Sequence, residues 1–99
     1  MKKLIALYKV PKDPEAFMER YRSGHLPLVD KIPNLIRTEL TLIDRTLMGE
    51  PGNYLLAEMY FENDAFKDAM QSPENAAAGG DLAKFAGGLV TIMIGSIVP

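Results

Sequence analysis

The 99-residue chain contains no cysteine, no tryptophan and a single histidine. The absence of cysteine excludes disulfide bonds, thiolate nucleophiles, iron–sulfur clusters and cysteine-ligated zinc sites. With one histidine, a transition-metal site within one chain would depend mainly on carboxylates, so we expect no bound metal. The glycine pairs at 79–80 and 87–88 lack the neighbouring residues that complete a phosphate-binding loop. We therefore expect no cofactor.

Long apolar runs are also missing. The longest, GLVTIMIGSIV, is strand-like and shorter than the roughly 18 residues of a membrane span. The N-terminal stretch MKKLIALYKVPKDP has only LIALY as its apolar part, which is too short for a signal peptide. The net charge of -2 gives no electrostatic reason to expect nucleic acid or an anionic membrane surface as a partner. We expect a cytoplasmic protein with neither nucleic acid nor membrane among its partners.

The composition is typical of one globular domain, covering residues 1–99, because 47% of the residues are hydrophobic and 24% are charged. Strand-like and helix-like segments follow one another in the order β-α-β-β-α-β. The predicted strands are 3–10, 35–44, 54–61 and 89–98, and the predicted helical segments are 13–24, 26–32, 63–71 and 72–86. Asp13, Asn63, Ser72 and Asp81 are placed as helix caps. This order predicts an α+β, ferredoxin-like fold, with a four-stranded antiparallel sheet covered by helices on one face.

The predicted strands are apolar on both faces, which is unusual for a sheet with one face in water. The third strand divides into Leu55, Ala57, Met59 and Phe61 on one face and Tyr54, Leu56, Glu58 and Tyr60 on the other. Since the chain has no further element for the second face, we expect another copy to cover it in a two-fold homodimer. We place Tyr8, Glu58 and Tyr60 on this covered face. They would line a mostly apolar cavity suited to a small apolar or aromatic metabolite.

The only histidine, His25, lies in the stretch YRSGHLPLVDKIP. One interpretation is structural, because a histidine at a junction between two helical pieces can bond free carbonyl groups. The other is chemical, because an imidazole with an ordinary pKa of about 6.5 suits a general acid or base near neutral pH. The pattern alone leaves both interpretations open.

Nearly the whole chain resembles the EthD family, named for its association with the degradation of ethyl tert-butyl ether. The matching residues of the N-terminal half are Tyr8, Pro11, Asp13–Pro14, Phe17, Tyr21, His25 to Leu28, Lys31 and Pro33. Those of the C-terminal half are Ser72 to Glu74, Asp81–Leu82 and Phe85. Asn34 stands where a glycine usually follows the proline, and asparagine tolerates the same left-handed backbone. The resemblance implies a dimeric α/β barrel, built from two ferredoxin-like subunits with their sheets face to face.

Similar dimeric barrels include isomerases, polyketide cyclases, small monooxygenases, dehydratases, decarboxylases and haem-handling proteins, so the fold does not choose a reaction. If the protein is an enzyme, we expect cofactor-free isomerisation, cyclisation, dehydration or decarboxylation. In this hypothesis His25 is the acid or base, and Tyr8 or Tyr60 stabilises charge that develops on oxygen. The expected substrate contacts are Tyr21, Leu56, Glu58, Tyr60 and Met93.

Other interpretations of these residues stay open. Tyr8 and Tyr60 could pair across neighbouring strands, Glu58 could pair with Arg37, and Tyr21 could belong to the core. The protein as a whole could bind a ligand or a toxic intermediate without chemistry, as an accessory protein of a degradation pathway. It could also handle haem with His25 as axial ligand, or form a barrel that is packed solid.

Overall fold

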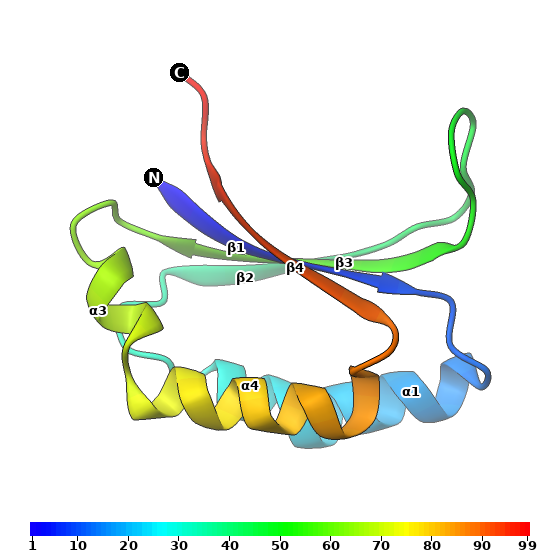
Figure 1. Ribbon diagram of the computed structural model, residues 1–99, viewed down its shortest axis with the longest axis horizontal. Helices are drawn as coiled ribbons and strands as arrows, with labels where there is room; N and C mark the ends of the chain where they lie inside the picture. Colours follow the sequence, from blue (N-terminus) through cyan, green and yellow to red (C-terminus); the bar gives the residue numbers. More distant parts are fainter.

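The computed structural model describes all residues from Met1 to Pro99. It contains one four-stranded antiparallel sheet with the strand order β2-β3-β1-β4, and the helices lie on one face of it (Figure 1). The strands are β1 (Lys2–Lys9), β2 (Arg37–Leu42), β3 (Asn53–Phe61) and β4 (Val90–Ser96). The predicted α+β, ferredoxin-like architecture is confirmed.

Five helical segments cover the sheet. They are α1 (Pro14–Arg20), the π-helical segment η1 (Tyr21–His25), α2 (Leu26–Val29), α3 (Phe66–Met70) and α4 (Pro73–Ala86). None of them has the length and the apolar character that crossing a bilayer requires. Two predicted caps are confirmed: the side chains of Asp13 and Ser72 accept hydrogen bonds from the first turns of α1 and α4, at 3.2 and 3.1 Å.

Two other predicted caps are wrong. Asn63 lies in a turn, closed by the bond from the Ala65 N–H to the Glu62 carbonyl, and α3 begins only at Phe66. Asp81 lies inside α4, which runs without a break through Gly79 and Gly80. An interior glycine costs a helix only about 1 kcal/mol, and the packing of α4 against the rest of the protein outweighs that cost.

The chain around His25 is continuously helical from α1 through η1 to α2. The sequence pattern predicts two separate helical pieces with a junction at His25, so it misses this continuity. The N–H of Leu26 donates to the carbonyl of Tyr21, five residues earlier, which defines the wide turn of η1. This turn reorients the chain between α1 and α2. It places Tyr21 and His25, both buried, on the side that faces the sheet.

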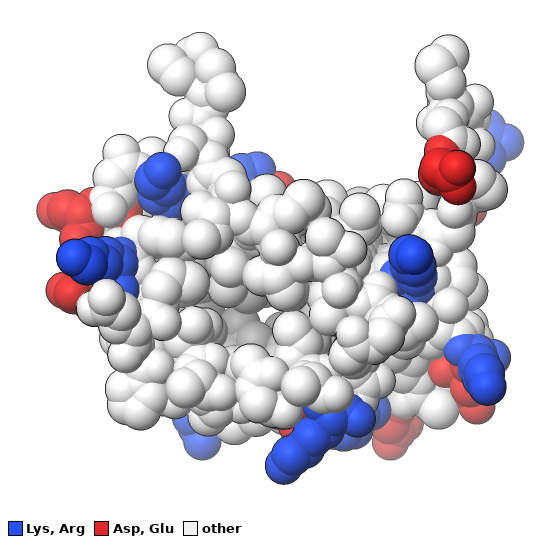
Figure 2. All heavy atoms as spheres, in the orientation of Figure 1, with Lys and Arg blue, Asp and Glu red and all other residues white.

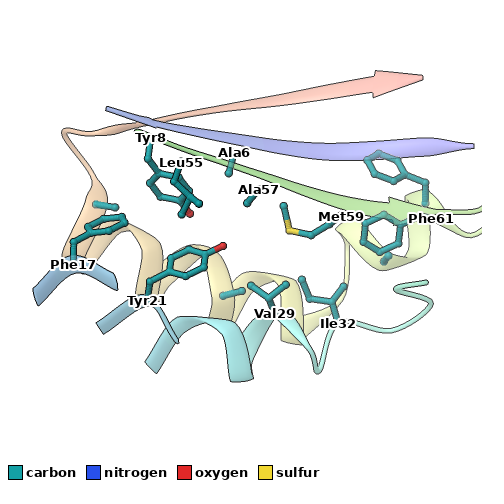
Figure 3. Packing of buried hydrophobic residues seen from close by; sticks show 14 residues of the cluster. Ala6, Tyr8, Phe17, Tyr21, Val29, Ile32, Leu55, Ala57, Met59 and Phe61 are labelled. Carbon is teal, nitrogen blue, oxygen red and sulfur yellow. The ribbon is translucent and has the colours of Figure 1, made fainter. Parts of the chain in front are cut away.

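The core lies between the sheet and the helices and includes fourteen buried residues. Figure 3 shows Ala6, Tyr8, Leu55 and Ala57 pointing from the sheet toward the helices. The prediction that Tyr8 shares a face with Glu58 and Tyr60 is wrong, because Tyr8 lies opposite Leu55 in the β1–β3 pairing. The prediction that Tyr8 and Tyr60 pair across strands is wrong for the same reason, since the partner of Tyr60 in β1 is Lys3.

The opposite side of the sheet carries no helix, and we call it the outer face (Figure 1). Its residues are Lys3, Ile5 and Leu7 of β1, Arg37, Glu39 and Thr41 of β2, Leu56, Glu58 and Tyr60 of β3, and Thr91 and Met93 of β4. The long loop between β2 and β3 and the C-terminal tail both extend toward this side. Asn34 adopts the expected left-handed backbone, with a φ of 66°.

Candidate functional site

A cavity of about 160 Å³ lies between the helix-covered face of the sheet and the helices. Ten of the thirteen residues that line it are hydrophobic. Leu4 and Ile92 approach it from the sheet, and Ala78, Gly79 and Leu82 approach it from α4. Figure 2 shows a hollow at this level, bordered by white atoms, which belong to none of the residue types Lys, Arg, Asp and Glu. The cavity therefore belongs to a single subunit and does not require a second sheet.

His25 lines this cavity, and only 4% of the residue is exposed. Its Nδ1 atom lies 3.1 Å from Oδ2 of Asp81, and its ring packs between the rings of Tyr21 and Phe85, with centroid distances of 5.4 and 5.2 Å. The second ring nitrogen, Nε2, has no hydrogen-bond partner in the protein. An imidazole held in this way can offer Nε2 to a molecule in the cavity.

Asp81 is held in turn by Arg20. The guanidinium approaches the carboxylate through both of its terminal nitrogens, at 3.1 Å (Nη1–Oδ2) and 2.5 Å (Nη2–Oδ1), and it lies 4.7 Å from the centre of the Phe85 ring. A two-point contact of this kind fixes the plane of a carboxylate. Gly24 leaves the space for it, because a Cβ atom at this position would lie 2.5 Å from Nη1 of Arg20.

The electrostatics of the pair favour a neutral imidazole. Burial lowers the pKa of His25 below its ordinary value, and the nearby Arg20 acts in the same direction, while the bond to Asp81 opposes the shift. The bonds from Arg20, and then the contact with His25, lower the pKa of Asp81. An ionised Asp81 accepts a hydrogen bond from Nδ1–H, which leaves Nε2 unprotonated and able to accept a proton.

Tyr8 and Tyr21 line the same cavity, and each is only 1% exposed. Their rings meet edge to face at a centroid distance of 5.6 Å, and Figure 3 shows both hydroxyl groups directed into the space between the sheet and the helices. Burial is the main cause that raises the pKa of Tyr21 to about 12, and it also raises the pKa of Tyr8; the two phenols interact with each other as well. Both phenols therefore stay protonated at neutral pH and can donate hydrogen bonds to an oxygen in the cavity.

Four of the seven predicted site residues lie elsewhere. Leu56, Glu58, Tyr60 and Met93 are on the outer face, separated from the cavity by the sheet. The prediction that they share a cavity with Tyr8 is wrong. The structure does bring together His25, Tyr8 and Tyr21, and it confirms that Tyr21 belongs to the core.

The polar groups of the outer face are already paired with one another. Glu58 Oε2 lies 2.6 Å from Nζ of Lys3, so its predicted pairing with Arg37 is wrong. Arg37 binds Glu39 at 2.8 Å instead, and the Tyr60 hydroxyl donates to the same carboxylate at 3.2 Å. Arg37 also lies over the Tyr60 ring, 3.9 Å from its centre. These contacts leave the outer face without a free acid or base directed at a ligand.

The sequence pattern does not identify Asp81 or Arg20 as site residues. The sequence pattern assigns Asp81 to a cap because it follows two glycines, and nothing near Arg20 in the chain indicates a partner 61 residues away. The one useful signal was the presence of Asp81 among the residues that match the EthD pattern. Nowhere do three histidine, aspartate or glutamate side chains converge on a position that could hold a metal ion.

Comparison with known protein sequences identifies a family and one relative. The model of the EthD domain matches residues 9–88. An uncharacterized 11.0 kDa protein of the thcB–thcC intergenic region of Rhodococcus erythropolis is 40% identical over 94 residues, which cover 94% of this chain and 91% of that protein.

Solved structures extend the comparison to the fold. The crystal structure of an EthD family protein from Bacillus halodurans is 45% identical, covers 99% of both chains and superposes with a TM-score of 0.90. A dimeric protein of unknown function with a ferredoxin-like fold, from Bacteroides fragilis, is 24% identical and has a TM-score of 0.61. That match covers 97% of this chain and 95% of the other.

Proposed function

Because the chain belongs to the EthD domain family, whose model covers residues 9–88, we propose that it is a cofactor-free acid–base enzyme acting on a small, largely apolar carbonyl compound. The observation that carries this proposal is the contact between His25 and Asp81 at the wall of an apolar cavity, with Nε2 of His25 left without a partner. A buried histidine oriented by a carboxylate is a recurrent arrangement for proton transfer.

The proposed step is the removal of a proton from the carbon next to the carbonyl group. Nε2 of His25 accepts the proton, the electron pair of the C–H bond forms a carbon–carbon double bond, and the carbonyl oxygen gains the negative charge. The hydroxyl groups of Tyr8 and Tyr21 donate hydrogen bonds to that oxygen. If the ketone also carries a β,γ carbon–carbon double bond, return of the proton from His25 to the γ-carbon moves that double bond into conjugation with the carbonyl group, and the isomerisation consumes no other reactant.

Asp81 acts as a positioning residue in this scheme. It keeps the proton of the neutral imidazole on Nδ1 and stabilises the imidazolium that forms after proton transfer. Arg20 holds the Asp81 carboxylate in place through its two bonds. The charge of Arg20 also keeps Asp81 ionised, since it lowers the pKa of that carboxyl group.

We also propose that two copies pair through the outer face. Leu56 and Ile5 leave much of this surface apolar, and Met93 is 41% exposed in the single subunit. The charged residues of this face form two ion pairs, Lys3–Glu58 and Arg37–Glu39. Covering the face with an apolar surface would therefore bury no unpaired charge. The dimeric state of the Bacteroides fragilis structure supports this pairing.

A binding protein without chemistry is the second candidate, favoured by the ten hydrophobic residues that line the cavity. A haem-handling role is not supported, because a cavity of about 160 Å³ is too small for a four-pyrrole macrocycle.

Hydrogen–deuterium exchange separates the first two candidates, the enzyme and the binding protein. The wild-type protein is incubated with small ketones and lactones in D₂O, and NMR follows deuterium incorporation next to the carbonyl group. Exchange that His25→Gln abolishes supports the enzyme, whereas ligand-induced spectral shifts without exchange support the binding protein.

A further inference from the structure

The volume of the cavity limits the size of its occupant. An engineered apolar cavity of roughly 150 Å³ in another protein holds one benzene ring, and the cavity here measures about 160 Å³. Ala78 and Leu82 of α4 and Met59 of β3 form close-packed walls that resist movement, while the cavity opens past Ile92, which is 46% exposed, so a second fused ring would stay in that open end, in water. The occupant therefore contains one ring of six atoms or a compact equivalent.

The charges around the cavity limit the charge of its occupant. No lysine, arginine, aspartate or glutamate lines the cavity. Arg20 lies behind His25 and already makes two bonds to Asp81, which also contacts His25. An anionic ligand would lose its hydration and find no free cation, and a cationic ligand would find no free carboxylate. The occupant is therefore uncharged.

The hydrogen-bonding groups of the cavity place one oxygen of the occupant. Tyr8 and Tyr21 approach from the sheet and from η1, and their rings meet edge to face. Figure 3 shows both hydroxyl groups in the same region between the sheet and the helices. Neither phenol is bound to a carbonyl or a carboxylate of the protein. The two phenols interact with each other, and a ligand oxygen that accepts from both would replace that contact. A carbonyl oxygen has the two lone pairs that this requires and brings no donor of its own.

We propose that the cavity binds an uncharged six-membered cyclic ketone, with its oxygen at Tyr8 and Tyr21 and its neighbouring CH₂ group at Nε2 of His25. This inference rests on the proposed function and adds the substrate class to it. It also assigns the two tyrosines a shared role in choosing that class.

The test compares four ligands by titrating each into the 99-residue protein and monitoring binding by NMR. Cyclohexanone is the expected ligand, and methylenecyclohexane has the same shape without the oxygen. 1-Decalone adds a second ring, and cyclohexanecarboxylate adds a charge. We expect cyclohexanone to bind about tenfold more tightly than methylenecyclohexane, as one or two hydrogen bonds allow. The other two should bind at least tenfold more weakly than cyclohexanone.

The double variant Tyr8→Phe/Tyr21→Phe should bind cyclohexanone and methylenecyclohexane equally, and unchanged affinity for methylenecyclohexane demonstrates an intact cavity. The inference would be overturned if 1-decalone or the carboxylate bound wild type as tightly as cyclohexanone does. It would also be overturned if the double variant kept its preference for cyclohexanone.

The proposed function has a separate readout, the exchange of ligand hydrogens. If cyclohexanone binds as expected but exchanges its hydrogens no faster than with His25→Gln, the enzyme proposal fails and the ligand class stands. If 1-decalone exchanges as fast as cyclohexanone, the ligand class fails and the enzyme proposal stands.

Discussion

Nδ1 of His25 lies 3.1 Å from Oδ2 of Asp81, a residue 56 positions later in the chain. The contact joins η1 to α4 at the wall of the cavity, and Arg20 contacts the same carboxylate from α1. Three helical segments therefore converge on one carboxyl group. This convergence makes the protonation state of His25 depend on residues that never touch the cavity.

The first prediction concerns proton transfer. His25→Gln should lower the rate of hydrogen exchange in a bound ketone by roughly 10²- to 10⁴-fold, because it removes the general base. Asp81→Asn should lower the same rate by at least about tenfold, since an amide in place of the carboxylate favours the wrong imidazole tautomer. Exchange rates measured by NMR check both. Full activity of His25→Gln in a correctly folded protein would remove His25 from the mechanism.

The second prediction concerns the titration of His25. NMR should give an imidazole pKa below the ordinary 6.5, because burial disfavours the charged ring. Asp81→Asn should lower this pKa further, since the contact with Asp81 favours the charged form. Arg20→Met should raise it, because the positive charge of Arg20 disfavours a second positive charge nearby. Shifts of the same sign in both variants would contradict the assigned network.

The third prediction concerns stability against pH. The folded protein holds His25 with a lowered pKa, so the unfolded chain binds a proton more readily between that value and 6.5. The contribution of a neutral His25 to the free energy of unfolding is complete above pH 6.5, and it decreases as the pH falls toward the folded pKa. Urea unfolding at several pH values should show this decrease in wild type. His25→Gln should lack it and keep only the decrease at lower pH from carboxyl groups such as Asp81.

The fourth prediction concerns Gly24. Glycine to alanine inside a helix usually stabilises a protein by about 1 kcal/mol. Gly24→Ala should do the opposite, because its Cβ would lie 2.5 Å from Nη1 of Arg20 and push the guanidinium off Asp81. The same change made in an Arg20→Ala background should be stabilising. Equal effects of Gly24→Ala in both backgrounds, measured by urea unfolding, would rule out this use of the space.

The fifth prediction uses two adjacent glycines of α4. A Cβ at Gly79 or at Gly80 would meet nothing within 4 Å, but only Gly79 lines the cavity. Gly79→Leu should abolish or strongly weaken cyclohexanone binding by placing a side chain at the cavity wall. Gly80→Leu should leave binding unchanged, while both variants keep or increase the stability of the helix. Equal binding by the two variants would place the ligand outside this cavity.

The pairing of two copies is tested by charge on the outer face. Met93→Glu should shift the protein toward monomers in sedimentation experiments, because pairing would bury the new carboxylate without a partner. Ala77→Glu introduces the same group on the exposed side of α4 and should leave the association unchanged. A Met93→Glu protein that sediments like wild type at micromolar concentration would exclude this surface as the interface.

Element order, strand positions and two helix caps follow from local chemistry, and the sequence predicts them well. The face of Tyr8 could not be predicted in the same way. Alternation within β1 separates Tyr8 from Leu7, but it does not say which set faces the helices. That depends on the register with Leu55 in β3, a contact between residues far apart in the chain.

The candidate site also contains residues that local sequence features indicate and residues that only contacts between distant parts of the chain define. The sequence points to His25 because it is the only histidine, and to Tyr21 because it matches a family pattern. The sequence pattern indicates a cap at Asp81, since two preceding glycines are a common signal for a new helix start. Its actual role comes from the wide turn of η1, which brings Arg20 and His25 to the same side of α4. No local pattern encodes that approach.

Strand β1 contributes to both surfaces of the sheet at alternate positions. Leu4, Ala6 and Tyr8 line the cavity, while Lys3, Ile5 and Leu7 lie on the outer face. Point substitutions can thus alter ligand contacts and subunit contacts independently, one position at a time. A single inserted or deleted residue in this segment would exchange the two sets. The identities of these residues can therefore change one at a time, whereas their spacing cannot.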